Sequence, residues 1–314
     1  MKKYNGALAQ LVEQWPFKPF VTGSNPVRPI KEDMKNILAI FLLLVSPQVF
    51  SETIKLNNLN AHYLSQDTKS ESIFIILHGT RGHKNLELIT MLRESLNDNG
   101  FDSISINLSY GIKNRKDDFL PCDIEHKHLV SDSLNEIKAW YDHSIKLGYK
   151  KIHLIGHSRG GSDILNFYEK LDHNDRSIID LVFLLAPSSD SNEDHLQKYM
   201  EDYQIDIKSI DDNDILKINF LGCNDAQVNG ISFKSYYYNF DNMSTIDALK
   251  TTTANTHVIT ASEDNIVPLT HEKVKISEEL NENVKLYKID GADHFFRDFY
   301  FDDLFEIVLD KTEQ

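Results

Sequence analysis

One segment constrains the fold more than any other: a short apolar run that passes straight into a turn of small residues and then into a helical pattern. The run covers residues 152–155, and the turn, 156–161, reads Gly-His-Ser-Arg-Gly-Gly. A strand can enter a helix across so tight a turn only where Gly156 and Gly160 leave room for the adjoining backbone. The pattern predicts a strand, a sharp turn that exposes Ser158, and a helix; a turn without chemistry is the alternative.

The rest of the chain from Glu52 onward alternates short apolar runs with helical patterns. The predicted buried strands are Ser72–Leu77, Asp102–Asn107, Lys151–Ile155, Leu181–Leu185, His257–Ala261 and Val284–Ile289. The predicted helices are Leu86–Asn97, Leu129–Leu147, Gly161–Leu171, His271–Leu280 and Phe299–Leu309. This alternation is typical of a doubly wound, mostly parallel sheet, the α/β class, and Thr53–Leu64 is predicted to add an antiparallel edge pair.

The alternation breaks at residues 186–255, where polar residues are frequent and the periodicity is weak. We interpret this stretch as a small cap inserted into a single domain that covers residues 52–314, and we expect it to form the substrate pocket. Its cluster Tyr236–Tyr238 would then either line the acyl pocket or pack within the cap.

Ser158 needs a base to take its proton before it can act as a nucleophile. His294 is the candidate, because it follows the predicted strand 284–289 with a glycine just before it. An acid should orient the imidazole ring and stabilise its charged form. Asp264 follows the predicted strand 257–261 and is our choice, with Glu263 as the nearest alternative.

Four segments in order resemble the α/β-hydrolase superfamily across about residues 72–310. They are the His-Gly turn at 78–79, the glycine-rich turn around Ser158, the acid loop that ends in Val267-Pro268, and the sequence Gly-Ala-Asp-His-Phe at 291–295. The order of serine, acid and histidine is also the order of that superfamily. The motifs do not assign a subfamily, because esterases, lipases, thioesterases and some peptidases share them.

The resemblance implies a triad of Ser158, Asp264 and His294, with no metal and no organic cofactor. It also implies an oxyanion hole made by two backbone N–H groups, those of Thr80 and Arg159, while His78 shapes the turn. We therefore expect hydrolysis of a small-molecule carboxylic ester through an acyl-enzyme. A serine peptidase or amidase, and a binding protein without catalysis, are the alternatives.

Two further groups of side chains have readings that the sequence leaves open. Asp123, Glu125, His126 and His128 cluster in one segment, which we interpret as a solvated polar loop, with a metal site as the alternative. The chain has two cysteines, Cys122 and Cys223, and both lie in segments predicted to be near the substrate face. Export would make a disulfide between them possible.

The formal net charge of the 314 residues is −15, with acidic residues scattered along the chain rather than grouped. Such a chain repels phosphate backbones, and no basic stripe offsets the repulsion. We therefore expect no nucleic-acid partner.

Residues 34–51 are typical of a secretory signal peptide. Met34-Lys35-Asn36 precedes the apolar run 37–45, and small residues follow up to Ser51, the predicted cleavage point. A run of that length is too short for a membrane span, which needs about 20 residues. We expect an exported protein, periplasmic or secreted, without stable membrane insertion after processing; a short buried helix is the alternative.

Residues 1–33 precede this signal and need another explanation. Ala9–Gln14 and Gly23–Pro26 correspond to what the D-arm and T-arm of a transfer-RNA gene would encode if they were translated. We therefore predict that Met34 is the true initiator and that residues 1–33 are a mis-assigned leader. A real but disordered leader is the alternative.

Overall fold

The computed structural model describes residues 50–238 and 244–314. The predicted leader, 1–33, lies outside the described residues, and so does the predicted signal peptide apart from Phe50 and Ser51. Those two residues begin the first strand. Within the two described ranges, no helix has the length and apolar character needed to cross a bilayer.

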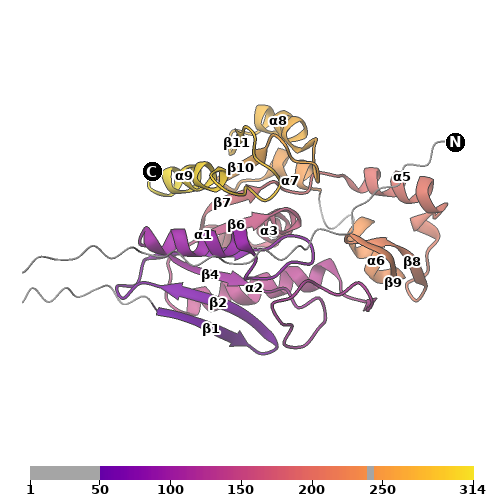
Figure 1. The fold of residues 1–314 in the computed structure, drawn as a ribbon, viewed down its shortest axis with the longest axis horizontal. Coiled ribbons are helices and arrows are strands. Elements are labelled where there is room, and N and C mark those ends of the chain that lie inside the picture. Colours follow the sequence, from indigo (N-terminus) through magenta and orange to yellow (C-terminus); the bar gives the residue numbers. More distant parts are fainter. Residues whose placement is uncertain (1–49, 239–243) are drawn as a thin grey trace, which may run out of the picture. The chain divides into compact units, whose positions relative to one another are not determined.

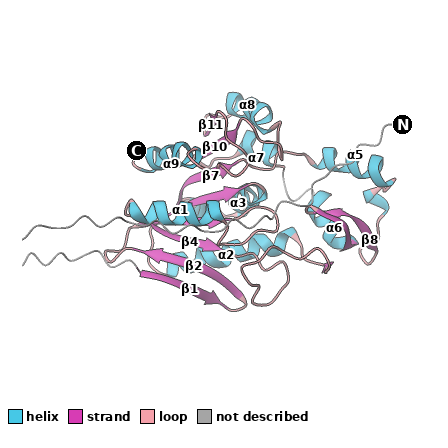
Figure 2. Ribbon diagram, in the orientation of Figure 1, coloured by secondary structure: helices cyan, strands magenta, loops and turns pink. Residues whose placement is uncertain are grey.

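Eight strands of the described chain form the central sheet, in the order β1-β2-β4-β3-β6-β7-β10-β11. Figure 2 draws the strands in magenta and the helices in cyan. The eight strands are β1 (Phe50–Leu56), β2 (Leu59–Ser65), β3 (Ser72–Leu77), β4 (Asp102–Ile106), β6 (Lys151–His157), β7 (Ile179–Leu185), β10 (Thr256–Ala261) and β11 (Val284–Ile289). Neighbours from β4 to β11 run parallel, whereas β1, β2 and β4 pair antiparallel. The predicted mostly parallel sheet and its antiparallel edge pair are confirmed.

β3 shows how the sheet is buried on both sides. Ile73, Ile75 and Leu77 belong to one apolar cluster, and Phe74 and Ile76 belong to the other. Successive side chains of a strand point to opposite faces, so a run that is apolar at every position has to be covered by helices on both faces. All of these side chains are 0% exposed.

The helices lie in two layers against these faces (Figure 1). One layer holds α1 (Glu87–Asp98) and α9 (Tyr300–Thr312); the other holds α2 (Val130–Lys146), α3 (Arg159–Lys170), α7 (Thr245–Thr251) and α8 (Thr270–Leu280), with the short α4 (His173–Arg176) before β7. α1 buries Leu88, Leu92 and Leu96, whose spacing of four residues places them on one stripe of the helix. The predicted helices are all present, with ends that differ by at most three residues.

The insertion after β7 contains elements that the sequence did not predict: α5 (Asn192–Tyr203), the 3₁₀ helix η1 (Ile207–Ser209), β8 (Ile215–Phe220), β9 (Cys223–Asn229) and α6 (Gly230–Tyr237). β8 and β9 form a hairpin, and β9 also pairs with β5 (Glu125–His126), so a second sheet of three strands joins the insertion to the loop after β4. The hairpin turn consists of Leu221 and Gly222, both with positive φ, as a tight two-residue turn requires.

Two buried histidines in the sheet make stability sensitive to acid. His153 on β6 is 3% exposed, its ring centroid lies 4.6 Å from that of Phe74, and its Nδ1 has no hydrogen-bond partner in the described chain. Burial lowers the pKa of His153 from 6.5 to about 4. Burial also lowers the pKa of His257, on β10, to about 4.

We expect the free energy of unfolding to fall as the pH decreases from 6.5 to about 4. In this window the unfolded chain takes up protons that the folded histidines exclude, so the stability present above 6.5 is lost toward the folded pKa. At about 1.4 kcal/mol per pKa unit, His153 contributes roughly 3 kcal/mol to this loss. Urea unfolding at neutral pH and at pH ~4.5 measures this loss. Between these two pH values, the free energy of unfolding should fall less in His153→Leu than in wild type. Equal losses in the two proteins would contradict this assignment.

Candidate active site

Ser158 lies at the turn between β6 and α3 in a backbone conformation that non-glycine residues rarely adopt. Its φ is 54° and its ψ is −126°, and such strain persists only where the surroundings impose it. The Ser158 N–H donates to Leu185 O at 2.8 Å, and its carbonyl accepts from the Gly161 N–H at 2.9 Å. The strained turn is therefore held from β7 and from the first turn of α3.

Gly156 and Gly160 leave no room for a side chain. A Cβ atom on Gly156 would lie 2.4 Å from Gly160 O, and one on Gly160 would lie 2.4 Å from His78 O. Both obstacles are backbone atoms, which cannot move aside as the end of a flexible side chain can. The strand, the helix and the loop after β3 meet at these two positions, and this is the steric reason for the small residues of the motif.

His294 and Asp264 lie in contact and are both buried. His294 Nδ1 is 2.8 Å from Asp264 Oδ2, and the side chains are 5% and 4% exposed. Each residue follows the end of a neighbouring parallel strand, β11 or β10, so both emerge at the same edge of the sheet. With Nδ1–H donated to the carboxylate, the other ring nitrogen is left free to accept a proton.

The loop that follows β10 keeps the carboxylate of Asp264 charged. Asp264 Oδ1 accepts hydrogen bonds from the N–H groups of Ile266 and Val267, each at 2.8 Å. Burial alone would raise the pKa of Asp264, but the hydrogen bonds from His294 and these N–H groups outweigh it and leave the pKa below its ordinary value. Glu263, the alternative acid, is exposed, and the described chain gives its carboxylate no contact with the ring.

Ser158 and His294 line the same pocket, together with Gly79 and Thr80. In the part of the chain that the structure describes, no hydrogen bond joins Ser158 Oγ to the His294 ring. Serine–histidine contacts are often loose without substrate and tighten when the substrate binds. Ser158 and His294 of the predicted triad thus line one pocket, and Asp264 contacts the His294 ring.

His157 is a residue at this site whose contribution sequence reasoning missed. Its Nε2–H donates to the His294 carbonyl at 2.9 Å, and the two ring centroids are 4.8 Å apart. Burial lowers the pKa of His157 to about 4, so the ring is neutral at pH 7 and adds no charge beside the triad. The only signal in the sequence was its position, directly before the serine at the end of a buried strand.

Two backbone N–H groups beside Ser158 are unpaired in the described chain, those of Thr80 and Arg159. Arg159 is the first residue of α3, where N–H groups lack helical partners and the helix dipole favours negative charge. Thr80 follows Gly79, and a Cβ atom on that glycine would be 3.1 Å from Ser158 Cβ. The predicted oxyanion donors therefore both lie next to the serine.

His78 is buried behind this loop, and its ring connects the backbone of the loop after β3 to the backbone of the segment after β4. Its Nδ1–H donates to Gly79 O at 2.8 Å, and its Nε2 accepts from the Leu108 N–H at 3.3 Å. Burial lowers the pKa of His78 to about 3, which keeps one nitrogen as a donor and the other as an acceptor. Its contacts are those of a structural residue.

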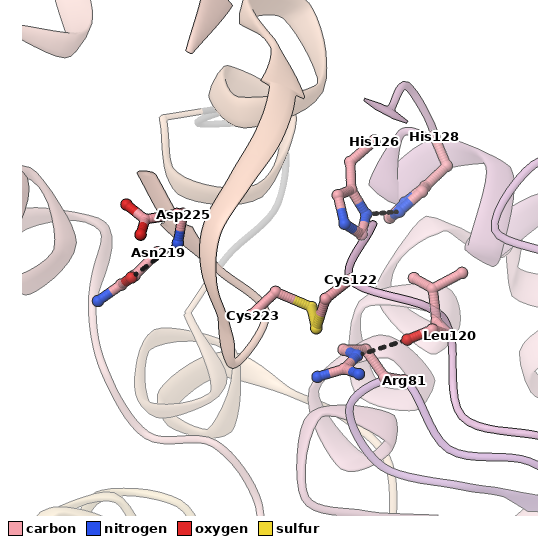
Figure 3. Close-up of a disulfide and its surroundings, with 8 residues drawn as sticks. All are labelled: Arg81, Leu120, Cys122, His126, His128, Asn219, Cys223 and Asp225. Carbon is pink, nitrogen blue, oxygen red and sulfur yellow. Dashed lines mark hydrogen bonds between the residues drawn. A yellow bond between two sulfur atoms is a disulfide. The ribbon is translucent and has the colours of Figure 1, made fainter. Parts of the chain in front are cut away.

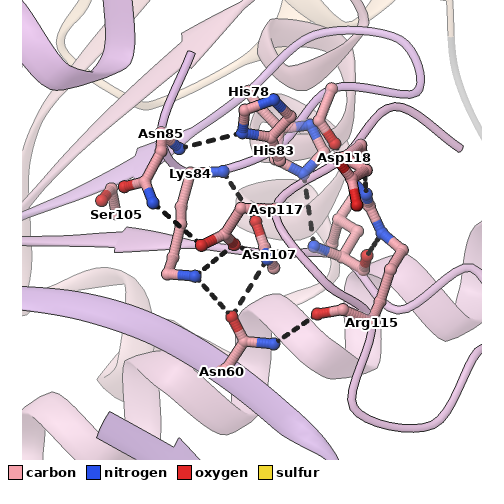
Figure 4. A network of polar contacts seen from close by, with 12 residues as sticks. Asn60, His78, His83, Lys84, Asn85, Ser105, Asn107, Arg115, Asp117 and Asp118 are labelled. Atoms are coloured by element: carbon pink, nitrogen blue, oxygen red, sulfur yellow. Dashed lines mark hydrogen bonds and ion pairs between the residues drawn. The ribbon is translucent and has the colours of Figure 1, made fainter. Parts of the chain in front are cut away.

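A buried polar network ties the loop of Thr80 to β2 and to the segment after β4 (Figure 4). Lys84 is 2% exposed; its Nζ donates to Asn60 Oδ1 at 2.7 Å and pairs with Asp117. The Lys84 N–H donates to Asn107 Oδ1 at 2.6 Å. A buried charge that loses its partner is strongly destabilising, so these residues hold the loop as a unit.

Arg115 adds a second set of bonds to the same loop (Figure 4). Its guanidinium donates to Gly82 O, to Leu108 O at 2.9 Å and to Asp118 O at 2.8 Å. The planar guanidinium group of Arg115 thus connects the loop after β3 to the segment after β4. Sequence reasoning assigned no role to Arg115, because nothing in its local pattern marks a buried arginine.

A pocket of about 360 Å³ opens beside Ser158 and His294. Its walls are mainly apolar: Leu86, Leu88, Ile89 and Met91 at α1, with Phe119, Ile266, Phe295 and Phe296 from three loops. None of the described residues that line it belongs to the insertion at 186–255. The expectation that the insertion forms this pocket is therefore wrong; α1 and the loops that carry the acid and the base form it.

A disulfide joins Cys122 to Cys223, with their Cα atoms 5.3 Å apart (Figure 3). It connects the segment after β4 to the tight hairpin of the insertion. Two residues before Cys122, Leu120 exchanges hydrogen bonds with Arg81: the Arg81 Nε–H donates to Leu120 O at 2.8 Å, and the Leu120 N–H donates to Arg81 O at 2.9 Å. The disulfide thus anchors a segment that contacts the residue after Thr80.

Of the segment predicted to be a solvated polar loop, Asp123 is exposed and Glu125 is partly exposed, but the two histidines are buried, contrary to the expectation from sequence. His126 and His128 are 0% and 4% exposed, and His128 Nδ1 lies 2.9 Å from the Tyr236 hydroxyl. Their rings pack against Phe220 of the insertion, which explains their burial (Figure 3 shows the two histidines). In the described chain, no three acidic, histidine or cysteine side chains are arranged to hold a metal ion.

The tyrosine cluster packs within the insertion. Tyr236 and Tyr237 are buried, and their rings contact those of Phe220 and Phe233. None of the residues 236–238 lines the pocket beside Ser158. Of the two readings left open by the sequence, packing is the one that the structure supports.

The family model for steryl acetyl hydrolases matches residues 46–276 of the chain. No curated protein matches the sequence. Among solved structures, Est1E from Butyrivibrio proteoclasticus is similar, with a TM-score of 0.60 and 18% identity over 84% of this chain and 99% of that one. E-2-(acetamidomethylene)succinate hydrolase is also similar, with a TM-score of 0.53 and 10% identity over 85% of this chain and 100% of that one. At these identities the structural likeness establishes the fold.

We expect the disulfide to contribute measurably to stability, because it closes a sequence separation of 101 residues. Replacing both cysteines, in Cys122→Ser/Cys223→Ser, should lower the free energy of unfolding by about 2–4 kcal/mol. Urea unfolding with and without dithiothreitol measures the effect, and the double variant is the control that reductant should leave unchanged. Two titratable thiols in the folded wild-type protein would contradict the bridge.

Proposed function

We propose that the protein works through an acyl-enzyme on Ser158. The premise is that the chain belongs to the steryl acetyl hydrolase family and is a serine hydrolase of carboxylic esters with the α/β-hydrolase fold. The observation that carries this proposal is the buried contact of 2.8 Å between His294 Nδ1 and Asp264. It leaves the second ring nitrogen available in the pocket that Ser158 also lines. The strained turn adds support, because strain of this kind gathers at functional sites.

In the first half of the reaction, Ser158 Oγ attacks the ester carbonyl carbon and its proton passes to His294 Nε2. Asp264 stabilises the imidazolium that results. The carbonyl oxygen becomes an oxyanion, which accepts hydrogen bonds from the N–H groups of Thr80 and Arg159. When the intermediate collapses, the C–O bond to the alcohol breaks and the alcohol leaves with the proton from His294.

In the second half, water repeats these steps. His294 takes a proton from the water as its oxygen attacks the acyl carbon, and the same N–H donors hold the second oxyanion. Collapse releases the carboxylic acid and returns the proton to Ser158 Oγ. The neutral ring of His157, whose pKa burial lowers to about 4, supports the loop of His294 throughout without competing for this proton.

The pocket favours an ester with a sizeable apolar group. Its volume of about 360 Å³ and its mainly apolar wall suit such a group better than a charged one. The family is described as steryl acetyl hydrolase, and one solved structure of Est1E has ferulic acid, an aromatic molecule, bound to it. We propose that the apolar part of a small-molecule ester lies against Leu88, Met91 and Phe295.

The triad variants test this function. Ser158→Ala should keep the fold, because alanine has the same Cβ at the strained turn, while activity on p-nitrophenyl esters should fall by about 10⁴ or more. His294→Ala should cost about as much, and Asp264→Asn somewhat less. A fluorophosphonate probe should label wild type and not Ser158→Ala. Glu263→Gln is the matched control that should keep wild-type rates.

If Ser158→Ala folds and retains wild-type esterase activity, the proposed function is wrong. Cleavage of aminoacyl amides in place of esters would favour a peptidase or amidase. Failure of the wild type both to react with the probe and to cleave any ester would favour a binding protein.

We also propose that the protein is exported. The signal-like residues 34–51 support this, and so does the disulfide, since disulfides persist mainly outside the reducing cytosol. Cleavage after Ser51 would remove only the first two residues of β1, both of which are exposed.

We expect the mature chain to begin near Glu52. Expression of the full open reading frame in a bacterial host, followed by N-terminal sequencing of the periplasmic or secreted protein, measures this. A shorter reading frame that starts at Met34 should give the same mature N-terminus. Exported protein that still carries residues 1–33 would rule out both the signal assignment and Met34 as initiator.

A further inference from the structure

A second, smaller pocket lies on the side of α3 that faces the insertion, and it shares no lining residue with the apolar pocket. Its volume is about 50 Å³, and its wall is mostly polar. The wall includes Arg159, Ser162 and Asp163 of α3, Ser188 and Asp190 after β7, and His195 of α5. Nothing in the proposed reaction uses the side chains of this pocket.

Two charged side chains face this pocket without a hydrogen-bond or ion-pair partner among the residues that the structure describes. In the described chain, the Arg159 guanidinium has no hydrogen-bond acceptor and no ion pair; it lies over the Tyr236 ring, whose centroid is 5.0 Å away. Asp163, one helical turn further along α3, is 6% exposed, and its carboxylate receives no hydrogen bond within the described residues. The two groups do not form an ion pair with each other.

Such an arrangement is costly unless something completes it. Asp163 is largely removed from water, and a buried carboxylate without a hydrogen bond destabilises the folded state, whereas a molecule that supplies a donor relieves that cost. Burial raises the pKa of Asp163 to about 6, with Arg159 acting in the opposite sense, so the carboxylate is mainly ionised at pH 7.5 and above. At that pH the two groups that lack partners in the described chain are one strong donor, Arg159, and one strong acceptor, Asp163.

The size and charge of the pocket define what it accepts. One water needs about 10–15 Å³ in this measure, so the pocket has room for roughly three to five waters or for a fragment such as a diol. The charges of Arg159 and Asp163 balance each other, and Asp190 is paired with Lys273, so neither an anion nor a cation gains a net attraction in the pocket. A neutral hydroxyl group accepts from the guanidinium and donates to the carboxylate without adding net charge.

The pocket is also close to the nucleophile. Arg159 follows Ser158 directly, so its N–H lies at the proposed oxyanion site while its side chain enters the second pocket. Ser188, another lining residue, donates its N–H to the Ser158 carbonyl at 3.3 Å. A substrate that spans Arg159 would therefore place one of its groups in the apolar pocket and another in the polar pocket.

We propose that the Arg159–Asp163 pocket is a subsite for the hydroxyl groups of a polyol alcohol, and that the enzyme prefers apolar acyl esters of polyols. This inference rests on the proposed ester hydrolysis at Ser158. The acyl chain lies in the apolar pocket, and the polyol places one hydroxyl between the guanidinium of Arg159 and the carboxylate of Asp163.

Two esters with the same acyl chain test the subsite: glycerol monohexanoate and propyl hexanoate, which differ only in hydroxyl groups. At pH ~7.5, kcat/KM of the wild type should be about tenfold to a hundredfold higher for the glycerol ester, the range expected for hydrogen bonds to charged groups. Asp163→Leu should abolish that preference, because its kcat/KM for the glycerol ester falls to its own value for the propyl ester. Asp303→Leu, at an exposed position of α9, is the matched control and should keep the preference.

A wild type without preference, or an Asp163→Leu variant that keeps it, would overturn the subsite. If the leucine variant does not fold, the isosteric Asp163→Asn replaces it and should also lower the preference, and an unchanged preference would overturn the proposal. Hydrolysis of the propyl ester distinguishes failure of the subsite from failure of the proposed function. If Ser158→Ala still hydrolyses this ester, the proposed function fails; if hydrolysis needs Ser158 but no polyol preference exists, only the subsite fails.

Discussion

The close approach of three backbone segments around Ser158 is the constraint on which the rest of the structure depends. β6, α3 and the loop after β3 meet where a Cβ atom on Gly156 or Gly160 would lie 2.4 Å from a backbone carbonyl oxygen. This contact gives Ser158 its positive φ and places the unpaired Arg159 N–H beside the Thr80 loop. This steric condition thus sets the position of the Ser158 hydroxyl and the positions of the N–H donors that would bind the oxyanion of the substrate.

Neutral histidines hold the loops that surround this contact. His78 joins the Thr80 loop to the segment after β4, and His157 supports the carbonyl of His294. Burial lowers the pKa of His78 to about 3 and that of His157 to about 4, so each ring keeps a donor and an acceptor at neutral pH. Lysine or arginine in these places would bring an uncompensated charge next to the triad.

Arg159 separates two environments. On the side of α1 the pocket is large and mainly apolar, and on the side of the insertion it is small and polar. The disulfide and the pairing of β5 with β9 attach the insertion to the segment after β4, and in this position it forms the polar side. The polar pocket therefore depends on contacts between parts of the chain that are distant in sequence.

The sequence by itself determined the strand and helix order of the main sheet and the positions of Ser158, Asp264 and His294 within it. These features follow from local patterns: apolar runs that must be buried, small residues at a tight turn, and polar residues directly after strands. Only the tertiary structure decided that Asp264 rather than Glu263 contacts the ring, that Cys122 meets Cys223, and that α1 rather than the insertion forms the apolar pocket. Each of these depends on which surfaces pack together across long sequence separations, and no local pattern encodes such packing.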